Sequence, residues 1–112
     1  MSITSDLIRG HTDAIILSRL KKSDSYGYEI NKAVRRFSGG KYELKEATLY
    51  SAFRRLEQQG MISSYWGDGD IGGRRRYYRM TDEGRITYER LRAEWDEAKE
   101  IIDSLMEEQE DA

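Results

Sequence analysis

The chain contains no cysteine and only one histidine, His11. Without cysteine there can be no disulfide framework, no thiolate metal site and no cysteine nucleophile. A single histidine also argues against a histidine-rich metal sensor and against a Ser-His-Asp triad. No apolar run approaches the length that spans a membrane, and the N-terminus lacks the hydrophobic segment of a signal peptide. We therefore expect a cytoplasmic protein without a metal or a cofactor.

Positive and negative charges are divided between two parts of the sequence. Residues 21–79 contain 13 Lys/Arg against 7 Asp/Glu, a net charge of +6, whereas residues 80–112 contain 4 against 12, a net charge of −8. This asymmetry indicates one surface that attracts a polyanion and another that repels it. The alternative is an acidic, solvated tail beside a neutral domain. The 112 residues are enough for one domain with a modest core, which dimerisation would enlarge.

Apolar periodicity predicts two helices before residue 40. The first begins at an N-cap, Ser5 or Asp6, and ends at Lys22; His11 lies within it. Its apolar surface is wide enough to face both the domain core and a second subunit. After a turn at 23–25, a second helix ends at two glycines, and a short extended segment is expected at 41–44. The apolar face of the second helix comprises Ile30, Ala33, Val34 and Phe37.

A third helix, at residues 46–59, has a sharply divided surface. Lys45 is a poor N-cap, and Gly60 suits the position after the last turn. The apolar residues form a buried stripe of Leu49, Ala52, Phe53 and Leu56. The opposite face presents Thr48, Ser51, Arg54, Arg55 and Gln58.

Two strands, at 61–66 and 75–80, follow the third helix. The link at 67–73 is too long for a two-residue turn, so we expect a mobile, glycine-rich loop. The arginine triplet at 74–76 is expected at the root of this hairpin. A lone hairpin is marginally stable, so it must pack on the helices, through Ile62, Tyr77 or Met80.

Thr81 is the expected N-cap of a final long helix, with Asp82 and Glu83 in its first turn. Apolar residues then alternate at spacings of three and four, the pattern of a seam that pairs with a second helix. This seam, the predicted dimer interface, comprises Tyr88, Leu91, Trp95, Ala98, Ile102 and Leu105. We expect residues 1–80 to form one domain, with the first helix shared with the dimer interface, and residues 81–112 to form the dimerisation helix.

Three helices, a two-stranded wing and a last helix describe a mainly α fold with a small β-hairpin, a winged helix-turn-helix. In such a fold the third helix enters the major groove of double-stranded DNA, and basic wing residues contact phosphates or the minor groove. Residues 1–80 are therefore expected to form the DNA-binding domain. The predicted DNA contacts are Lys45, Thr48, Tyr50, Ser51, Arg54, Arg55, Gly73, Arg74, Arg75 and Arg76. The alternative is that Arg54 and Arg55 merely pair with Glu46 or Glu57 on a solvated helix.

Three segments of the chain resemble PadR-type transcriptional regulators: SYGYEI at 25–30, ATLYSAFRRLEQQGMISSYW at 47–66 and GGRRRYYRMTDEG at 72–84. The resemblance extends from Leu7 to about Leu105. It implies a winged-helix homodimer that represses transcription from inverted-repeat operators. It also implies that the last helix of one subunit packs against the first helix of its partner.

The ISSYWGD segment, the GGRR hairpin and the lone tryptophan of the last helix look most like a small multidrug-binding subgroup of that family. In this subgroup, planar aromatic compounds stack between paired tryptophans at the dimer centre. The resemblance gives that role to Trp95, with a lining of Leu7, Ala14, Leu17, Ser18, Leu91, Lys99 and Ile102. Lys99 departs from the subgroup, whose best-known member is acidic there, although Asp13, Asp96 and Asp103 could compensate. Alternatively, Trp95 is an ordinary residue of the seam; Trp66 is expected to pack in the wing or the core.

A protein-interaction module is the competing interpretation, with the winged helix bound to another protein and the acidic last helix as the contact surface. The arginine triplet argues against it. An enzyme is not expected, because acid pairs such as Glu94 and Glu97 lie on a solvated helical face. The glycines at 67–73 form a hairpin tip without a following helix, so they are no nucleotide fingerprint. The sequence therefore favours a ligand-responsive repressor.

Overall fold

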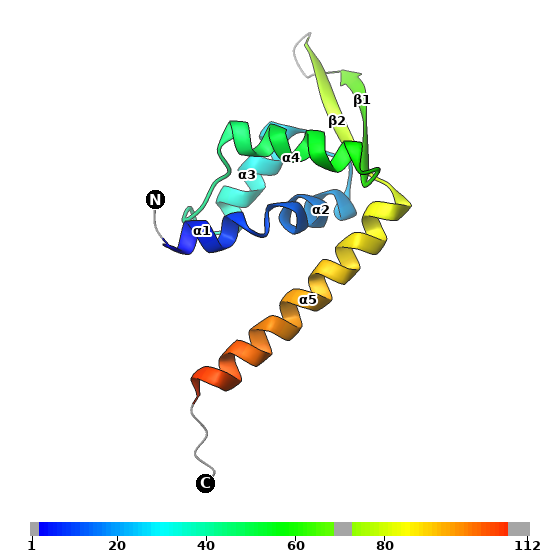
Figure 1. The fold of residues 1–112 in the computed structure, drawn as a ribbon. Helices are drawn as coiled ribbons and strands as arrows, with labels where there is room; N and C mark the ends of the chain where they lie inside the picture. The colour runs from blue at the N-terminus through cyan, green and yellow to red at the C-terminus, as the bar shows by residue number, and fades with distance from the viewer. Residues whose placement is uncertain (1–2, 69–72, 108–112) are drawn as a thin grey trace.

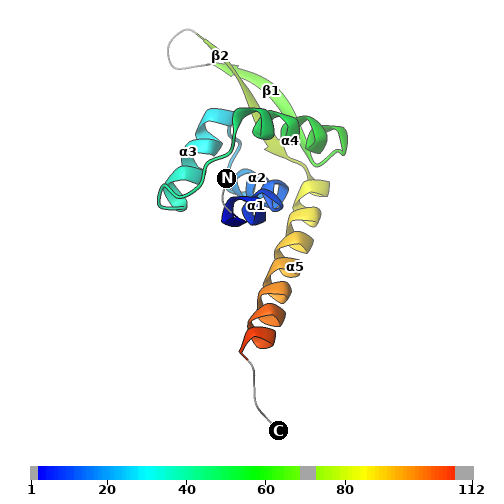
Figure 2. The same ribbon diagram turned by 60° about the vertical axis from the view of Figure 1, so that its left-hand side comes forward.

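A computed structural model describes residues 3–68 and 73–107 of the chain. Helices α2, α3 and α4 form a bundle, the two strands rise from one end of α4, and α5 projects away from the bundle (Figures 1 and 2). The elements are α1 (Ile3–Arg9), α2 (Thr12–Lys22), α3 (Gly27–Phe37), α4 (Glu46–Gln58), β1 (Ile62–Asp68), β2 (Arg74–Met80) and α5 (Asp82–Met106). None of the described helices is both long enough and apolar enough to span a membrane. The predicted mainly α fold with a small hairpin is confirmed.

The core lies between α2, α3 and α4 and is closed by the base of the hairpin. Its buried residues are Ile16, Leu17, Leu20, Ile30, Val34, Leu44, Leu49, Ala52, Phe53, Leu56, Ile62 and Tyr78. The predicted stripe of α4 is confirmed, since all four of its members are buried. The segment at 41–44 forms no strand. Instead, the backbone of Leu44 is held by the amide side chain of Asn31, through bonds of 2.7 and 2.8 Å.

The N-terminal prediction of one helix is wrong, because the chain breaks at Gly10 and His11 between α1 and α2. Glycine is a poor helix former, and the Thr12 hydroxyl donates to the Arg9 carbonyl at 2.7 Å, which fixes the corner. The helix begins at Ile3, so neither Ser5 nor Asp6 is an N-cap. His11 lies outside both helices, in the N-cap position of α2.

Contrary to the prediction, Phe37 does not lie on the core face of α3. Its side chain is 68% exposed, and the guanidinium groups of Arg19 and Arg36 lie 4.9 and 5.5 Å from its ring centroid. Cation–π contacts thus replace burial at the last turn of the helix. The helix ends there as expected, since Gly39 and Gly40 both adopt positive φ.

The hairpin, which we call the wing, pairs β1 with β2 in an antiparallel register from Ile62↔Met80 to Asp68↔Arg74. The predicted packing through Ile62 is confirmed, since Ile62 is buried in the core, and Met80 packs against the core, whereas Tyr77 does not belong to it. Tyr78 is a further anchor that was not predicted: its ring stacks on Phe53 at 3.9 Å between centroids, and burial raises the pKa of its hydroxyl. The backbone of Tyr78 also exchanges two hydrogen bonds with Ser25, of 2.8 and 3.2 Å. These contacts fix the base of the wing to α4 and to the turn that precedes α3.

Both strands are longer than predicted. β1 continues through Gly67 and Asp68, and β2 begins at Arg74, so the arginine triplet starts at the outer end of the wing and not at its root. The rest of the predicted loop, 69–72, lies outside the described residues. The strands exceed their predicted length because cross-strand pairing continues to the Asp68↔Arg74 pair, beyond the point where apolar alternation ends in the sequence.

Helix α5 begins as predicted, with the Thr81 hydroxyl accepting a bond from the Gly84 N–H at 3.0 Å. The same hydroxyl donates to the Gly60 carbonyl at 2.7 Å. Gly84 is buried against the backbone of Met61, and a Cβ added there would lie 2.0 Å from the Met61 carbonyl oxygen. This close approach fixes the direction in which α5 leaves the wing.

We expect Gly84→Ala to lower the free energy of unfolding by about 2 kcal/mol or more, because the added methyl overlaps backbone that cannot move aside. Thermal unfolding followed by circular dichroism measures the change, about 10 °C for a domain of this size. Gly10→Ala is the matched control, since a Cβ there meets only the Leu7 carbonyl oxygen, at 3.4 Å. Equal melting temperatures for the two variants would contradict the proposed constraint.

Candidate nucleic-acid interface

The polar side of α4 forms an exposed ridge. Ala47, Ser51, Arg54 and Gln58 are spaced four, three and four residues apart, and all four are exposed. We call these residues the α4 ridge. Tyr50 lies on one side of it and is 44% exposed, while Thr48 and Arg55 lie on the other side. Lys45 is exposed immediately before the first turn. The buried apolar stripe thus turns most of the predicted contact residues of α4 outward.

Arg54 and Arg55 differ in their surroundings. The Arg55 guanidinium donates to the carboxylate of Asp13, in the first turn of α2. Within residues 3–68 and 73–107, Arg54 has no ion-pair partner. Neither arginine pairs with Glu46 or Glu57, so the alternative of local pairing on α4 is wrong. Arg54 therefore presents an uncompensated positive charge on the α4 ridge.

Glu57 is instead used to hold the wing. Its carboxylate accepts a bond of 2.7 Å from Ser64 and lies 3.5 Å from the Arg76 guanidinium. Arg76 also donates to the Ser64 hydroxyl at 2.9 Å. Arg76 of the wing is thus tied to α4.

Strand alternation divides the arginine triplet between the two faces of the wing. Arg74 and Arg76 lie over the ring of Trp66, at 5.2 and 5.8 Å, whereas Arg75 lies 4.5 Å from the ring centroid of Tyr26 on the other face. Trp66 belongs to the wing, as predicted, and is more than half exposed. Gly73 is exposed directly before β2.

A cleft of about 310 Å³ separates the wing from the start of α3 and from α4. No carboxylate is among the described residues that line it, which are Tyr26, Gly27, Tyr28, Tyr50, Arg74, Arg75 and Arg76. Gly27 allows Tyr50 to approach, since a Cβ there would lie 2.6 Å from the Tyr50 hydroxyl. The Arg75 guanidinium lies on this face of the wing, and three tyrosines line the cleft, which gives it the chemistry of an anion site.

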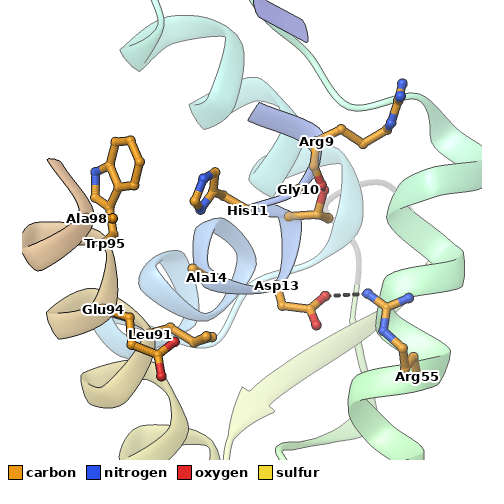
Figure 3. Close-up of a pocket in the computed structure, with 11 residues that line it drawn as sticks. Arg9, Gly10, His11, Asp13, Ala14, Arg55, Leu91, Glu94, Trp95 and Ala98 are labelled. Carbon is orange, nitrogen blue, oxygen red and sulfur yellow. Dashed lines mark hydrogen bonds and ion pairs between the residues drawn. The ribbon is translucent and has the colours of Figure 1, made fainter. Parts of the chain in front are cut away.

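The second region of interest is a cavity of about 530 Å³ at the corner between α1 and α2, bounded by α4 and α5 (Figure 3). Of the predicted ligand residues, Trp95, Ala14 and Leu91 line it. The indole of Trp95 is 39% exposed and meets the His11 ring edge-on, with centroids 4.8 Å apart. Trp95 is thus neither fully buried nor free of contacts within its own chain.

The other predicted ligand residues lie outside this cavity. Leu17 is fully buried in the core, so it presents no surface to a ligand. Ser18 donates to the Ile15 carbonyl at 2.6 Å, and Lys99 lies 3.6 Å from Asp96. Leu7 and Ile102 are exposed elsewhere on α1 and α5.

Of the charged and histidine residues that line this cavity, sequence reasoning connected only Asp13 with a ligand site and missed Arg9, His11, Arg55 and Glu94. Gly10 was the available signal, because a glycine inside a helical pattern marks a break that would bring His11 to a corner. The pairing of Arg55 with Asp13 had no such signal, since the two lie 42 positions apart.

The predicted dimer seam on α5 is covered by its own chain at the start of the helix and is exposed near the end. Tyr88 and Leu91 pack against the core of their own chain, beside an ion pair of 3.0 Å between Lys21 and Glu89. Further along, the apolar side chains are uncovered: Ile101, Ile102, Leu105 and Met106. The single chain therefore leaves an apolar surface over the last turns of α5.

Comparison with known proteins agrees with this architecture. Residues 16–90 match the model of the family described as "Transcriptional regulator PadR-like family". A transcriptional regulator from Clostridium thermocellum is 50% identical, with a TM-score of 0.83; the match covers 92% of this chain and 97% of that one. A PadR family transcription regulator from Clostridium difficile R20291 is 37% identical, with a TM-score of 0.73; coverage is 86% of this chain and 98% of that one.

A further relative, described as "Uncharacterized protein X", comes from Lysinibacillus sphaericus. It is 47% identical over 105 residues, which cover 94% of this chain and 96% of the relative. The family inferred from the sequence segments is confirmed. The chain belongs to the PadR-like family, whose members are DNA-binding transcriptional regulators and not enzymes.

Proposed function

We propose that this protein is a ligand-responsive repressor that binds an inverted-repeat operator as a homodimer. In this proposal residues 1–80 bind DNA and residues 81–112 dimerise. A repressor of chromosomal operators works in the cytoplasm. The observation that carries the proposal is the α4 ridge with the uncompensated charge of Arg54 at its centre. Inserted into the major groove, this ridge would place Ser51 and Arg54 against base edges.

The wing supports the same orientation. Arg74, Arg75 and Arg76 leave the outer part of β2 close to Tyr50 of α4, around one anion-type cleft. Lys45 adds a positive charge at the first turn of α4, and Gly73 lets the backbone of the wing approach DNA closely. These residues would contact the sugar–phosphate backbone beside the major groove.

Dimerisation is supported by the uncovered apolar end of α5. Trp95, Ala98, Ile102 and Leu105 continue one helical face beyond the part that packs on its own core. A second copy related by a two-fold axis would cover this face and would present two α4 ridges to the two halves of a palindromic operator.

The cavity at Trp95 supports an effector site for a planar aromatic compound. Its volume lies in the range of small-molecule sites, and it offers an aromatic ring, apolar side chains and a few polar groups. We place Trp95, Ala14 and Leu91 in this site, with Leu7, Ser18, Lys99 and Ile102 nearer the proposed partner. The Asp96 carboxylate lies 3.6 Å from Lys99 but also pairs with Arg92 at 3.1 Å, so it offsets the Lys99 charge only in part.

We expect Arg54→Ala to weaken binding to a duplex that the wild-type protein selects from a random-sequence pool. The loss should be about 1–3 kcal/mol, because one guanidinium contact is removed. Fluorescence anisotropy measures the affinity. Arg92→Ala, which removes an exposed arginine paired with Asp96 on α5, is the matched control and should bind as wild type does.

Two outcomes would count against the proposed DNA contact. If Arg54→Ala bound like the Arg92→Ala control, Arg54 would not touch DNA. If the wild-type protein showed no salt-dependent DNA binding at all, the protein-interaction module would be the better interpretation.

We expect Ile102→Asp to dissociate the dimer, because a buried, unpaired carboxylate is costly at an apolar interface. Sedimentation velocity should show a dimer dissociation constant raised by about a hundredfold or more. Ala93→Asp, on the opposite side of α5, adds the same charge to an exposed position and should leave the dimer intact. A dimer that survives Ile102→Asp would mean that another surface holds the two copies together.

We expect Trp95→Ala to reduce the affinity for a planar acridine dye by about tenfold or more, since it removes the stacking surface. Trp66→Phe is the control, because Trp66 is the other tryptophan of the chain and lies in the wing. In that variant all tryptophan emission comes from Trp95, so the dye should still quench it. Unchanged dye affinity in Trp95→Ala would remove Trp95 from the site.

A further inference from the structure

The α4 ridge is flanked by a cleft on each side. One is the anion-type cleft beside Tyr50 and the wing arginines. The other, of about 370 Å³, lies between α4 and the corner where α1 meets α2. Its lining residues are Arg9, Thr12, Ala47, Thr48, Ser51, Ala52 and Arg55.

These two clefts lie on opposite flanks of the ridge because of helical geometry. At 100° per residue, Tyr50 falls on one side of Ser51 and Arg54, and Thr48 and Arg55 fall on the other. The major groove is about 12 Å wide, little more than the diameter of a helix with its side chains. A helix that enters the groove therefore meets a sugar–phosphate backbone on both flanks.

We propose that the cleft between α1 and α4 is a second phosphate-binding site. In it, Arg9 and Arg55 bind the sugar–phosphate backbone that lies opposite the one contacted by the wing. The inference rests on the proposed DNA binding by α4, and it gives α1 a role in DNA binding that the sequence did not indicate. Arg9 precedes the segment that matches the family model, which begins at residue 16.

The chemistry of this cleft suits a phosphodiester. Two guanidinium groups supply charge and paired N–H donors, and the exposed Ser51 and half-buried Thr48 add hydroxyl donors. The Arg9 side chain is 45% exposed and forms an ion pair of 2.7 Å with Asp6. Such exposed pairs contribute little free energy, so a phosphate can compete for the guanidinium.

Arg55 must exchange partners to take part. In the structure its guanidinium is bound to Asp13, and both groups lie on the surface. The Asp13 carboxylate therefore competes with the phosphate for the Arg55 guanidinium. Figure 3 shows Arg9 and Asp13 extending toward α4, with Trp95 at the other end of the larger cavity.

The two cavities share Arg9, Thr12 and Arg55. A compound bound beside Trp95 would thus contact the same arginines that hold the phosphate. This shared lining provides a direct physical link between an effector and DNA affinity, because any ligand that changes the position of Arg9 or Arg55 changes the phosphate site.

The test is the salt dependence of binding to a labelled duplex of mixed sequence, about 30 base pairs long, which suffices because phosphate contacts are independent of sequence. Between about 50 and 200 mM salt, Arg9→Ala should reduce the slope of log K against log salt by about one. Affinity at low salt should fall by about tenfold. Arg90→Ala is the matched control: it also removes an exposed arginine from a local ion pair, with Glu94 at 3.1 Å, but lies on α5.

Asp13→Asn tests the competitor. This substitution removes the carboxylate that pairs with Arg55, so DNA affinity should rise by about two- to fivefold, which corresponds to the free energy of an exposed ion pair. In an Arg55→Ala background the same change should bring no gain. Equal gains in both backgrounds would show that Asp13 acts only through its charge and would overturn the role of Arg55.

The failures of the two proposals are distinguishable. Suppose that Arg54→Ala weakens binding while Arg9→Ala and Arg90→Ala share the same slope of log K against log salt. In that case the second phosphate site is overturned and DNA binding by α4 stands. If the wild-type protein shows no salt-dependent binding to the duplex, both are overturned. Circular dichroism melts of each variant exclude unfolding as the cause of a loss.

Discussion

Burial of the apolar side of α4 is the constraint on which the rest of the structure depends. Leu49, Phe53 and Leu56 are almost inaccessible to solvent, and burial of each stabilises the fold by about 1.5–3 kcal/mol. This contact fixes the rotation of α4 about its own axis, so the α4 ridge faces outward. Phe53 also receives the ring of Tyr78, so the same apolar stripe anchors the wing.

The wing and α5 are attached to the core around α4 in two different ways. The wing is held by apolar stacking, by backbone bonds to Ser25 and by the Glu57 carboxylate, all near its base. Helix α5 is attached through Gly84, whose backbone contact with Met61 sets its direction. Because α5 then leaves the core, the proposed dimer contact at its far end would set the spacing of two α4 ridges without disturbing the core of either chain.

Much of the fold could be predicted because its signals are local. The stripe of α4 repeats with helical period, Gly39, Gly40 and Gly60 end helices with positive φ, and Thr81 caps α5. The failures have local causes as well. Phe37 fitted the period of α3 but lies beyond the core, and wide apolar patterning hid the break at Gly10. Strand length was underestimated because cross-strand pairing carries no apolar signal near the hairpin tip.

The sequence by itself determined the family, the order of the elements and the outward face of α4, because these depend on periodicity and on contiguous segments such as 47–66. Only the tertiary structure decided which arginines are engaged. Arg54 and Arg55 are neighbours in sequence, yet Arg55 meets Asp13 of α2 and Arg54 meets no ion-pair partner among the described residues. Likewise, only folding brings Arg9 beside Thr48 and His11 beside Trp95. Such juxtapositions join residues dozens of positions apart, and the physical reason is that they are fixed by the packing of helices against one core.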